Sequence, residues 1–461
     1  MTALHRLSGK AVTQIAKPTK KATMIILLLA GTLTLALGTQ GAEHLDVQAE
    51  RDPTRDELAF CIIQTSDGGY ALAGMTASFG AGAEDFWLVK TDSSGNMEWN
   101  KTYGGVGEEC AYCVIQTSDG GYASVGETIA PLSVAADFLL VKTDSSGNMQ
   151  WNKTYGGVDG DFAYSVVETI DEGYALVGYL ATLGAGKDDF ELIKTDADGN
   201  MEWNKTYGGA NIDRAVSLVY TNDGGYALAG DTFSFGVMDG GNFWLVKTDS
   251  SGNMQWNKTY AGVDYNVANS IIQTVDEGYA LAGRIESAEV NGNIIPSNHQ
   301  ARLVKVDSSG NLEWNKTYGG NDWEDASCVI ESSHGGYVLA GATMSYGAGN
   351  WDYWLIKTDS SGNMQWNKTY GGDNVDGASC VVETSDGGYA LVGHTMSFGA
   401  DNYDFWLVKV DSSGNMEWNK MYGGTPEIRP WILIVSAATA VMIITVAAIV
   451  KYRSRKRTSA S

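Results

Sequence analysis

The sequence predicts an all-β fold, a seven-bladed β-propeller with four strands in each blade. The segment WNKTYGG begins at Trp99, Trp151, Trp203, Trp314 and Trp366, and near-copies begin at Trp256 and Trp418. A tyrosine that follows Gly-Gly or Glu-Gly recurs at Tyr70, Tyr122, Tyr174, Tyr226, Tyr279, Tyr337 and Tyr389. Seven units of about 52 residues therefore fill Glu57 to Gly424, and this period, with strand-like content, is typical of propeller blades.

Each unit contains four strand-like stretches separated by turn residues. In the first unit these are CIIQT from Cys61, YALAGMT from Tyr70, DFWLVKT from Asp85 and MEWNKTY from Met97. They are short and rich in aromatic and β-branched residues. The turns Asp-Gly-Gly and Ser-Gly-Asn supply the positive φ angles that tight hairpins need.

The repeated WNKTY stretch predicts how the blades pack. Alternation along a strand places Trp99, Lys101 and Tyr103 on one face and Asn100 and Thr102 on the other. One large aromatic residue per blade is what packing between neighbouring blades requires. We expect blade one to close the ring by packing against blade seven. The alternative is that each blade starts at the third strand, so that the N-terminal hairpin completes the last blade.

Both ends of the chain carry membrane signals. Lysines precede the apolar run from Met24 to Leu37, which is the pattern of a secretory signal peptide, although an uncleaved signal anchor is the alternative. The uncharged run from Trp431 to Val450 has the length of a transmembrane helix, and the basic stretch KYRSRKR after it favours a cytoplasmic C-terminus. The predicted organisation is a signal segment 1–42, a linker 43–56, the propeller 57–424, a linker 425–430, a transmembrane helix 431–450 and a cytoplasmic tail 451–461. This predicts a single-pass protein of the cell membrane with an extracellular propeller.

The charge of the chain argues against nucleic acid as a partner. The formal net charge is −24 at pH 7, whereas nucleic-acid binding requires a basic surface. An acidic surface attracts cations or basic partners. The alternative is that the charge only solvates the surface of an exported protein.

The unit DGGYALAG…DFWLVKTDSSGNMEW resembles the seven-bladed propeller repeats of archaeal and bacterial cell-surface proteins. The turn from Asp92 to Trp99 also resembles the tryptophan-docking turn of quinoprotein propellers, and Tyr-x-x-x-Gly in the second strand is similar to kelch repeats. The resemblance covers about four-fifths of the chain. It implies the fold and says little about activity, because one fold hosts many functions.

The loops after strands two and four share one face, and these loops vary between blades. Variable loops on a rigid scaffold are the usual place for binding. Tyr265 and Trp323 are the aromatic residues of the connections between blades. The fifth unit is longer than the others and carries Arg284, His299 and Arg302 in and around an irregular loop. We therefore expect these five residues to contact a ligand or partner.

An oxygen-rich residue recurs four positions before a serine or cysteine of the first strand. The set is Glu57, Glu109, Asp161, Asp213, Asn266, Glu324 and Asp376. If the first strand is innermost, these side chains could ring the central axis and bind a hard cation such as Ca²⁺. The alternative is that each side chain caps its own turn. The cofactor is otherwise unknown.

Two further sets follow the repeat. The pattern N-K-T makes Asn100, Asn152, Asn204, Asn257, Asn315 and Asn367 predicted N-glycosylation sites on the outermost strand. Cys61, Cys113, Cys328 and Cys380 occupy one first-strand position that is serine in the other three blades, which indicates small, buried residues and no disulfide framework.

No catalytic motif departs from the repeat, so we expect no catalytic residues and no enzymatic activity. The predicted function is a non-enzymatic binding or adhesion module whose partner is a glycan or another envelope protein. The alternatives are a quinone-dependent or other propeller enzyme and a structural subunit of the cell envelope.

Overall fold

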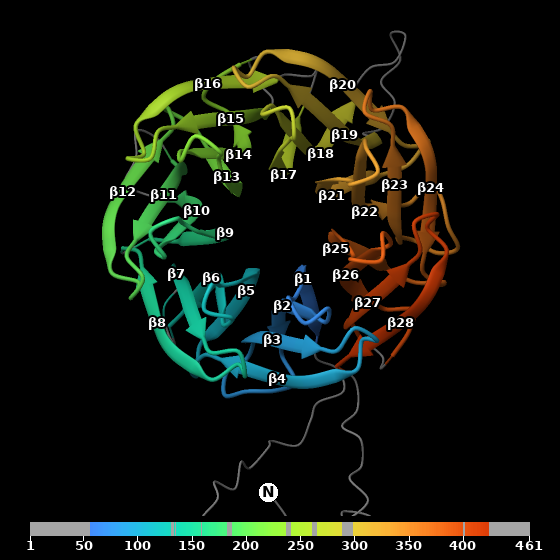
Figure 1. Cartoon of the computed structure of the whole chain (residues 1–461), viewed down its shortest axis with the longest axis horizontal. Helices are drawn as coiled ribbons and strands as arrows, with labels where there is room; N and C mark the ends of the chain where they lie inside the picture. The colour runs from blue at the N-terminus through green and yellow to red at the C-terminus, as the bar shows by residue number, and fades with distance from the viewer. Residues whose placement is uncertain are drawn as a thin grey trace, which may run out of the picture. The chain divides into compact units, whose positions relative to one another are not determined.

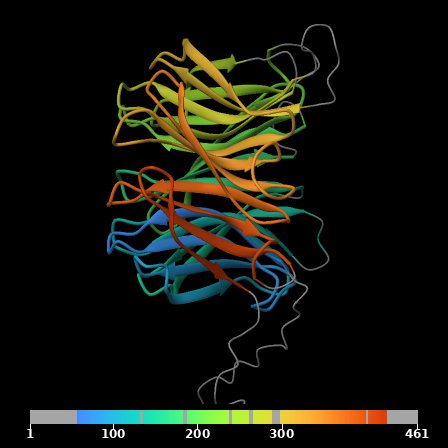
Figure 2. The ribbon, with the colours of Figure 1, turned by 90° about the vertical axis from the view of Figure 1, so that its right-hand side faces the viewer.

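The computed structural model describes residues 56–423, apart from 131–132, 134, 158, 182–186, 237–240, 261–264, 288–297 and 400–401. The described residues form seven four-stranded antiparallel sheets. These sheets are arranged as blades around a common axis, with the first strand of each blade innermost (Figure 1). Turns and loops gather at two opposite faces of the ring (Figure 2). The prediction of a seven-bladed propeller is confirmed.

The innermost strands are β1 (Glu57–Gln64), β5 (Glu108–Gln116), β9 (Asp161–Glu168), β13 (Asp213–Tyr220), β17 (Asn266–Gln273), β21 (Glu324–Glu331) and β25 (Asp376–Glu383). The second strands are β2 (Tyr70–Thr76), β6 (Tyr122–Ile129), β10 (Tyr174–Leu180), β14 (Tyr226–Thr232), β18 (Tyr279–Ser287), β22 (Tyr337–Thr343) and β26 (Tyr389–Thr395). The third strands are β3 (Asp85–Thr91), β7 (Ala136–Thr143), β11 (Asp189–Thr195), β15 (Asn242–Thr248), β19 (Asn298–Val306), β23 (Asp352–Thr358) and β27 (Asp404–Val410). The outermost strands are β4 (Met97–Tyr103), β8 (Met149–Tyr155), β12 (Met201–Tyr207), β16 (Met254–Tyr260), β20 (Leu312–Tyr318), β24 (Met364–Tyr370) and β28 (Met416–Tyr422).

The sequence pattern of each strand reflects its place in the blade. Every residue of β2 and β3 is buried, because these strands are covered by neighbouring blades on both faces. Their sequences are accordingly almost continuously apolar. In the outermost strand β4 three residues are exposed, three are partly buried and only Tyr103 is buried.

The innermost strand begins earlier than the sequence predicts. We expected it to start at Cys61, but β1 starts at Glu57 and contains a β-bulge between Ala59 and Cys61. A bulge places two residues opposite one and breaks the period-two alternation that reveals a strand in sequence. The equivalent bulge in β21 lies between Ala326 and Cys328.

The tryptophan of WNKTYGG docks on the next blade. A Cβ atom on Gly147 would lie 2.7 Å from the Trp99 ring, and Gly147 has a φ of 74°, so this turn needs glycine for both space and conformation. The Trp99 ring also meets Tyr122 edge-on at 5.7 Å between centroids. The hydroxyl of Tyr103 donates a hydrogen bond of 2.7 Å to the carbonyl oxygen of Gly147. The predicted role of this segment in blade packing is confirmed.

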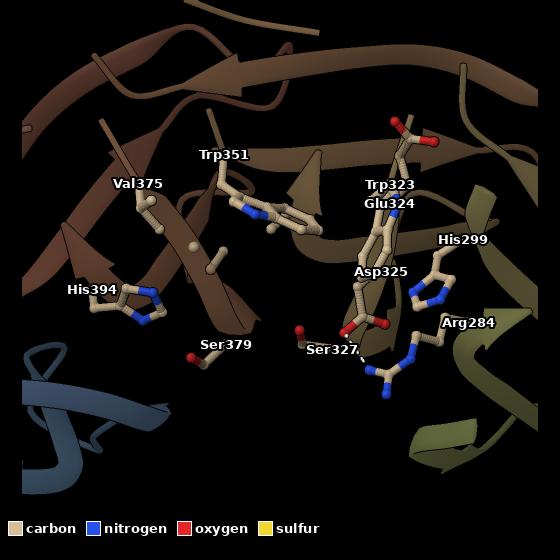
Figure 3. Close-up of a pocket in the computed structure, with 13 residues that line it drawn as sticks. Arg284, His299, Trp323, Glu324, Asp325, Ser327, Trp351, Val375, Ser379 and His394 are labelled. Atoms are coloured by element: carbon tan, nitrogen blue, oxygen red, sulfur yellow. Dashed lines mark hydrogen bonds and ion pairs between the residues drawn. The ribbon is translucent and has the colours of Figure 1, made fainter. Parts of the chain in front are cut away.

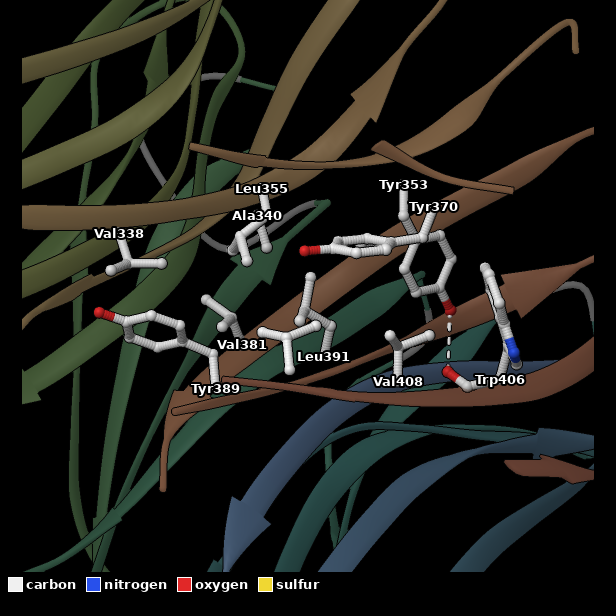
Figure 4. Packing of buried hydrophobic residues seen from close by; sticks show 12 residues of the cluster. Val338, Ala340, Tyr353, Leu355, Tyr370, Val381, Tyr389, Leu391, Trp406 and Val408 are labelled. Atoms are coloured by element: carbon white, nitrogen blue, oxygen red, sulfur yellow. Dashed lines mark hydrogen bonds between the residues drawn. The ribbon is translucent and has the colours of Figure 1, made fainter. Parts of the chain in front are cut away.

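Each interface between blades holds its own hydrophobic cluster. Between blades six and seven, Val338 and Leu355 pack against Tyr389 and Trp406 (Figure 4). The buried hydroxyl of Tyr353 donates a hydrogen bond of 2.9 Å to the Trp406 carbonyl oxygen across this interface. Burying aromatic surface in this way is the main source of propeller stability.

Blade one and blade seven close the ring by packing, as we expected. Strands β1 to β4 form one sheet and β25 to β28 another, so no strand is exchanged between them. Trp418 meets Tyr70 edge-on at 6.1 Å. The Tyr422 hydroxyl donates a hydrogen bond of 2.8 Å to the Gly95 carbonyl oxygen. This junction repeats the contacts of the internal blade interfaces.

The predicted signal segment, both linkers apart from Asp56, the transmembrane helix 431–450 and the cytoplasmic tail lie outside the described residues. Within the part of the chain that the structure describes, no helix is long and apolar enough to cross a membrane.

The contact that closes the ring can be tested against an equivalent contact inside it. We expect Tyr422→Phe to lower the free energy of unfolding by about 1 kcal/mol, because a buried hydrogen bond is lost. Tyr103→Phe is the matched control, since its hydroxyl makes the same bond between blades one and two. Urea denaturation of both variants measures the difference. A loss in Tyr103→Phe with none in Tyr422→Phe would show that the closing contact does not form.

Candidate functional site

The seven blades differ most at one cross-strand pair near the axis. The pair joins the residue before the constant alanine of the innermost strand to the residue after glycine in the second strand. The seven pairs are Leu58 with Met75, Cys110 with Glu127, Phe162 with Tyr179, Arg214 with Asp231, Val267 with Arg284, Asp325 with Ala342, and Gly377 with His394. In every blade the residue before this position of the innermost strand is a carboxyl or amide residue, and the residue after it is an alanine. The pairs are therefore the part of the repeat that is not needed for architecture.

In the first three blades this region is filled by aromatic rings. Phe60 and Tyr112 lie 5.2 Å apart between centroids, and Tyr112 and Tyr164 lie 4.8 Å apart. Tyr164 stacks on Tyr179 at 5.8 Å, and the guanidinium of Arg214 lies 5.1 Å from the Tyr179 ring. These contacts fill the space between the innermost strands on the side of the ring formed by blades one to three.

Blades five to seven leave a pocket of about 410 Å³ at the corresponding place. The bulge position that holds Phe60 and Tyr112 elsewhere holds Ser327 and Ser379 here, so the small side chains leave space. The pocket is lined by Arg284, His299, Trp323, Glu324, Asp325, Ser327, Ala342, Trp351, Val375, Gly377, Ala378, Ser379 and His394 (Figure 3). Its size is within the range of small-molecule sites.

One wall of the pocket carries an ion pair. Arg284 Nη1 lies 3.5 Å from Asp325 Oδ2, and the two side chains are 32% and 24% exposed. The side-chain amide of Asn269 donates a hydrogen bond of 3.0 Å to Asp325 Oδ1. Burial raises the pKa of Asp325, and the positive charge of Arg284 opposes that rise. The Nε of Arg284 is buried and has no hydrogen-bond partner among the described residues.

Two tryptophans provide the flat apolar surfaces. The His299 ring lies on Trp323, with centroids 4.1 Å apart and planes tilted by 30°. Trp323 remains 41% exposed. Trp351 projects into the space between Trp323 and His394 (Figure 3). The pocket therefore combines aromatic faces with a rim of polar groups.

His394 forms the far wall. A Cβ atom on Gly377 would lie 3.0 Å from the imidazole, so the missing side chain at Gly377 makes room for the ring. The Nδ1 atom of His394 is buried, and no described residue forms a hydrogen bond with it. Burial lowers the pKa of His394 to about 4, and the ring is therefore neutral at pH 7.

The structure brings together three of the five residues that we expected to contact a ligand. Arg284, His299 and Trp323 line the pocket. Tyr265 lies elsewhere and packs against Phe233 at 5.5 Å. Arg302 is only 4% exposed, because it takes the position held by tryptophan in most third strands and its guanidinium lies 5.1 Å from the Phe243 ring. It donates hydrogen bonds to the Tyr260 carbonyl and to Asn266 Oδ1, at 3.2 and 2.9 Å, so its role is in packing.

The predicted cation ligands lie inside the blades. Glu57, Glu109, Asp161, Asp213, Asn266, Glu324 and Asp376 are all buried. Asp376 shows the pattern: one oxygen accepts from Thr395, and the other accepts a 2.8 Å hydrogen bond from the Gly372 backbone N–H. This geometry matches the turn-capping alternative. Among the described residues, no group of three or more histidine, cysteine, aspartate or glutamate side chains is placed to hold a metal ion.

The six asparagines of the N-K-T pattern are exposed on the outermost strands, where a sugar could be attached. Their modification remains a prediction. Asn100 also accepts a 3.3 Å hydrogen bond from the Trp87 indole, and Asn257 and Asn367 do the same in their own blades.

Sequence reasoning missed Asp325, Trp351 and His394. The signal that would have found Asp325 and His394 is the divergence of one position between repeats whose neighbours are nearly constant. Trp351 lies in the loop before β23, at a place where the other blades carry no tryptophan.

Comparison with known proteins supports the fold only. No protein-family model and no curated protein matches the chain. The structure of puromycin hydrolase is similar with a TM-score of 0.50 and 12% identity, over 83% of this chain and 57% of that one. The WD40 domain of Neurospora crassa Pan2 gives 0.46 and 9%, over 73% and 85%. A protein of unknown function from Bacteroides caccae gives 0.40 and 11%, over 65% and 94%.

The lowered pKa of His394 predicts a pH effect on stability. Between the folded value of about 4 and the ordinary value of 6.5 the unfolded chain binds more protons, so stability rises with pH across this range. His394→Gln should remove a component on the order of 2 kcal/mol from the difference between pH 6.5 and pH 4. Denaturant titrations at both pH values measure it. His334→Gln, in a turn on the opposite face, is the control and should leave that component in place.

Proposed function

We propose that the protein is a non-enzymatic binding propeller whose pocket between blades five and seven holds a neutral, sugar-like ligand. The observation that carries this proposal is the pocket itself, which occurs where blades six and seven carry serine at the bulge position instead of the aromatic residues of blades one to three. The contacts of tryptophan with the turn glycine between blades are the same in kind in every blade. Where neighbouring blades differ from the other blades only at positions near the axis, those differences indicate a function other than folding.

The lining favours a neutral ligand with one apolar and one polar side. Arg284 and Asp325 neutralise each other, and His394 is uncharged at pH 7, so the carboxyl group of Glu324 is the remaining acidic group of the lining and disfavours an anionic ligand. The rings of Trp323 and Trp351 suit the C–H face of a sugar. The imidazole of His394 and the hydroxyls of Ser327 and Ser379 suit its hydroxyl groups.

The carboxyl groups of the pocket support binding over catalysis. Asp325 is already held by Arg284 and Asn269. Glu324 accepts hydrogen bonds from Thr343 and from the backbone N–H of Gly320, at 3.1 Å each. Groups committed to such contacts orient a ligand and hold the loops in place.

We further propose that the propeller is displayed outside a membrane, anchored by residues 431–450. The support is the sequence alone: an apolar N-terminal run, a second uncharged run of 20 residues and a basic stretch after it. A neutral glycan of the cell envelope would then lie within reach of the pocket.

The pocket proposal predicts a defined ligand class. We expect the purified full-length chain to bind neutral oligosaccharides on a glycan array and to prefer them to sialylated or sulfated ones. Trp323→Ala should weaken binding of the best sugar at least about tenfold in calorimetry, because a stacking surface is lost.

Tyr265→Ala is the matched control. Tyr265 is the other aromatic residue of the connections between blades that sequence reasoning selected, and it lies away from the pocket. Its replacement should leave the affinity unchanged. Equal losses in both variants, or a preference for anionic sugars, would contradict the proposal.

A further inference from the structure

Four of the five cysteines of the innermost strands occupy one equivalent position, and they lie in four consecutive blades of the closed ring, which are blades six, seven, one and two. They are Cys328, Cys380, Cys61 and Cys113, and Ser165, Ser217 and Ser270 complete the ring. All four thiols are free and none is fully exposed. The sequence places the four cysteines at equivalent positions of their strands. Because blade seven packs against blade one, ring closure also makes Cys380 a neighbour of Cys61.

Each side chain at this position bonds to the next blade. The Cys328 thiol lies 3.8 Å from the Val381 carbonyl oxygen, and the Cys380 thiol lies 4.0 Å from that of Ile62. In the serine blades, Ser270 accepts a 3.2 Å hydrogen bond from the Val329 backbone N–H. Serine thus also contacts the backbone of the next blade, as an acceptor from an N–H group, so the position does not require a thiol.

The sulfur atoms of Cys328 and Cys380 are 3.5 Å apart. A disulfide bond is about 2.05 Å long, so the two atoms need to approach by about 1.5 Å to be joined. Each cysteine directly follows a bulge serine of the pocket, since Ser327 precedes Cys328 and Ser379 precedes Cys380. Any movement that joins the sulfurs also moves the strands that carry these two serines.

We propose that Cys328 and Cys380 form a reversible disulfide between blades six and seven that narrows the ligand pocket. The effect on ligand affinity rests on the proposed function, whereas the disulfide itself does not. Exported proteins meet oxidising conditions in which such bonds persist.

The oxidant is a low-molecular-weight disulfide, and the reaction is thiol–disulfide exchange. The Cys380 thiolate attacks one sulfur of the reagent, forms a mixed disulfide and releases one thiolate. Cys328 then loses its proton and attacks the Cys380 sulfur, which releases the second thiolate. Two protein thiols are oxidised, one reagent disulfide is reduced to two thiols, and the two protons pass to the released thiolates.

Cys380 is suited to the first attack. Its sulfur lies 3.5 Å from that of Cys328, and when the Cys328 thiol donates a hydrogen bond to it, the pKa of Cys380 falls below its usual value. The thiolate is the attacking species, so a lowered pKa increases its fraction at neutral pH.

The test treats the reduced full-length chain with 2-hydroxyethyl disulfide, blocks remaining thiols, and maps cross-linked peptides by mass spectrometry without reduction. We expect a Cys328–Cys380 link and a higher midpoint of thermal unfolding. Cys328→Ser and Cys380→Ser should each abolish this link, while Cys113→Ser should leave it intact. Serine already occupies the position in three blades, so these variants should fold.

The proposal would be overturned if Cys328 and Cys380 both remained free thiols after treatment. It would also be overturned if Cys380 kept the reagent as a mixed disulfide, or if it linked to Cys61 instead of Cys328. The cross-link is measured without ligand, so it stands or falls independently of the pocket. Where a sugar binds, oxidation should weaken its affinity at least about threefold in the wild type and leave it unchanged in Cys328→Ser. An unchanged affinity in the oxidised wild type would overturn the coupling to the pocket.

Discussion

The structure depends on one contact, the docking of an outer-strand tryptophan on a turn glycine of the next blade. Trp99 covers Gly147, and the same arrangement continues around the ring until Trp418 covers Gly95. The contact requires a wide ring on one blade and a residue without Cβ, at positive φ, on the other. Because it occurs at every junction, including the closing one, it sets the spacing of the blades and removes the need for a shared strand.

This constraint explains why so much of the sequence is copied and where it is free to change. Residues that face a neighbouring blade, such as Tyr103 and Leu88, have equivalents of the same kind throughout, because each interface needs the same shape. Positions that face the axis meet no such requirement. Aromatic rings fill them in blades one to three, and Ser327 and Ser379 leave them open in blades six and seven. The symmetric exterior therefore supports an asymmetric interior.

The fold could be predicted almost completely from sequence, because repeats report the period, the turns and the interface residues seven times over. The start of the innermost strand was missed because the bulge at Phe60 breaks the alternation that marks a strand. The site was predicted in part. Arg284, His299 and Trp323 attracted notice as irregularities in or near the longest unit, but only the packing of three blades reveals that His394 faces them. Arg302 was misplaced, because a charged residue in an irregular unit was taken to be exposed, whereas it fills a tryptophan position.

The bulge of the innermost strand places a pocket residue directly beside a residue of the interface between blades. It inserts one residue into the innermost strand, and that residue points to the axis, while the next one lies at the interface between blades. In blade six these are Ser327 and Cys328, and in blade seven Ser379 and Cys380. The proposed disulfide would therefore act on the pocket through the single peptide bond that joins each cysteine to its serine. The rigid exterior and the adjustable interior are therefore consequences of the same strand geometry.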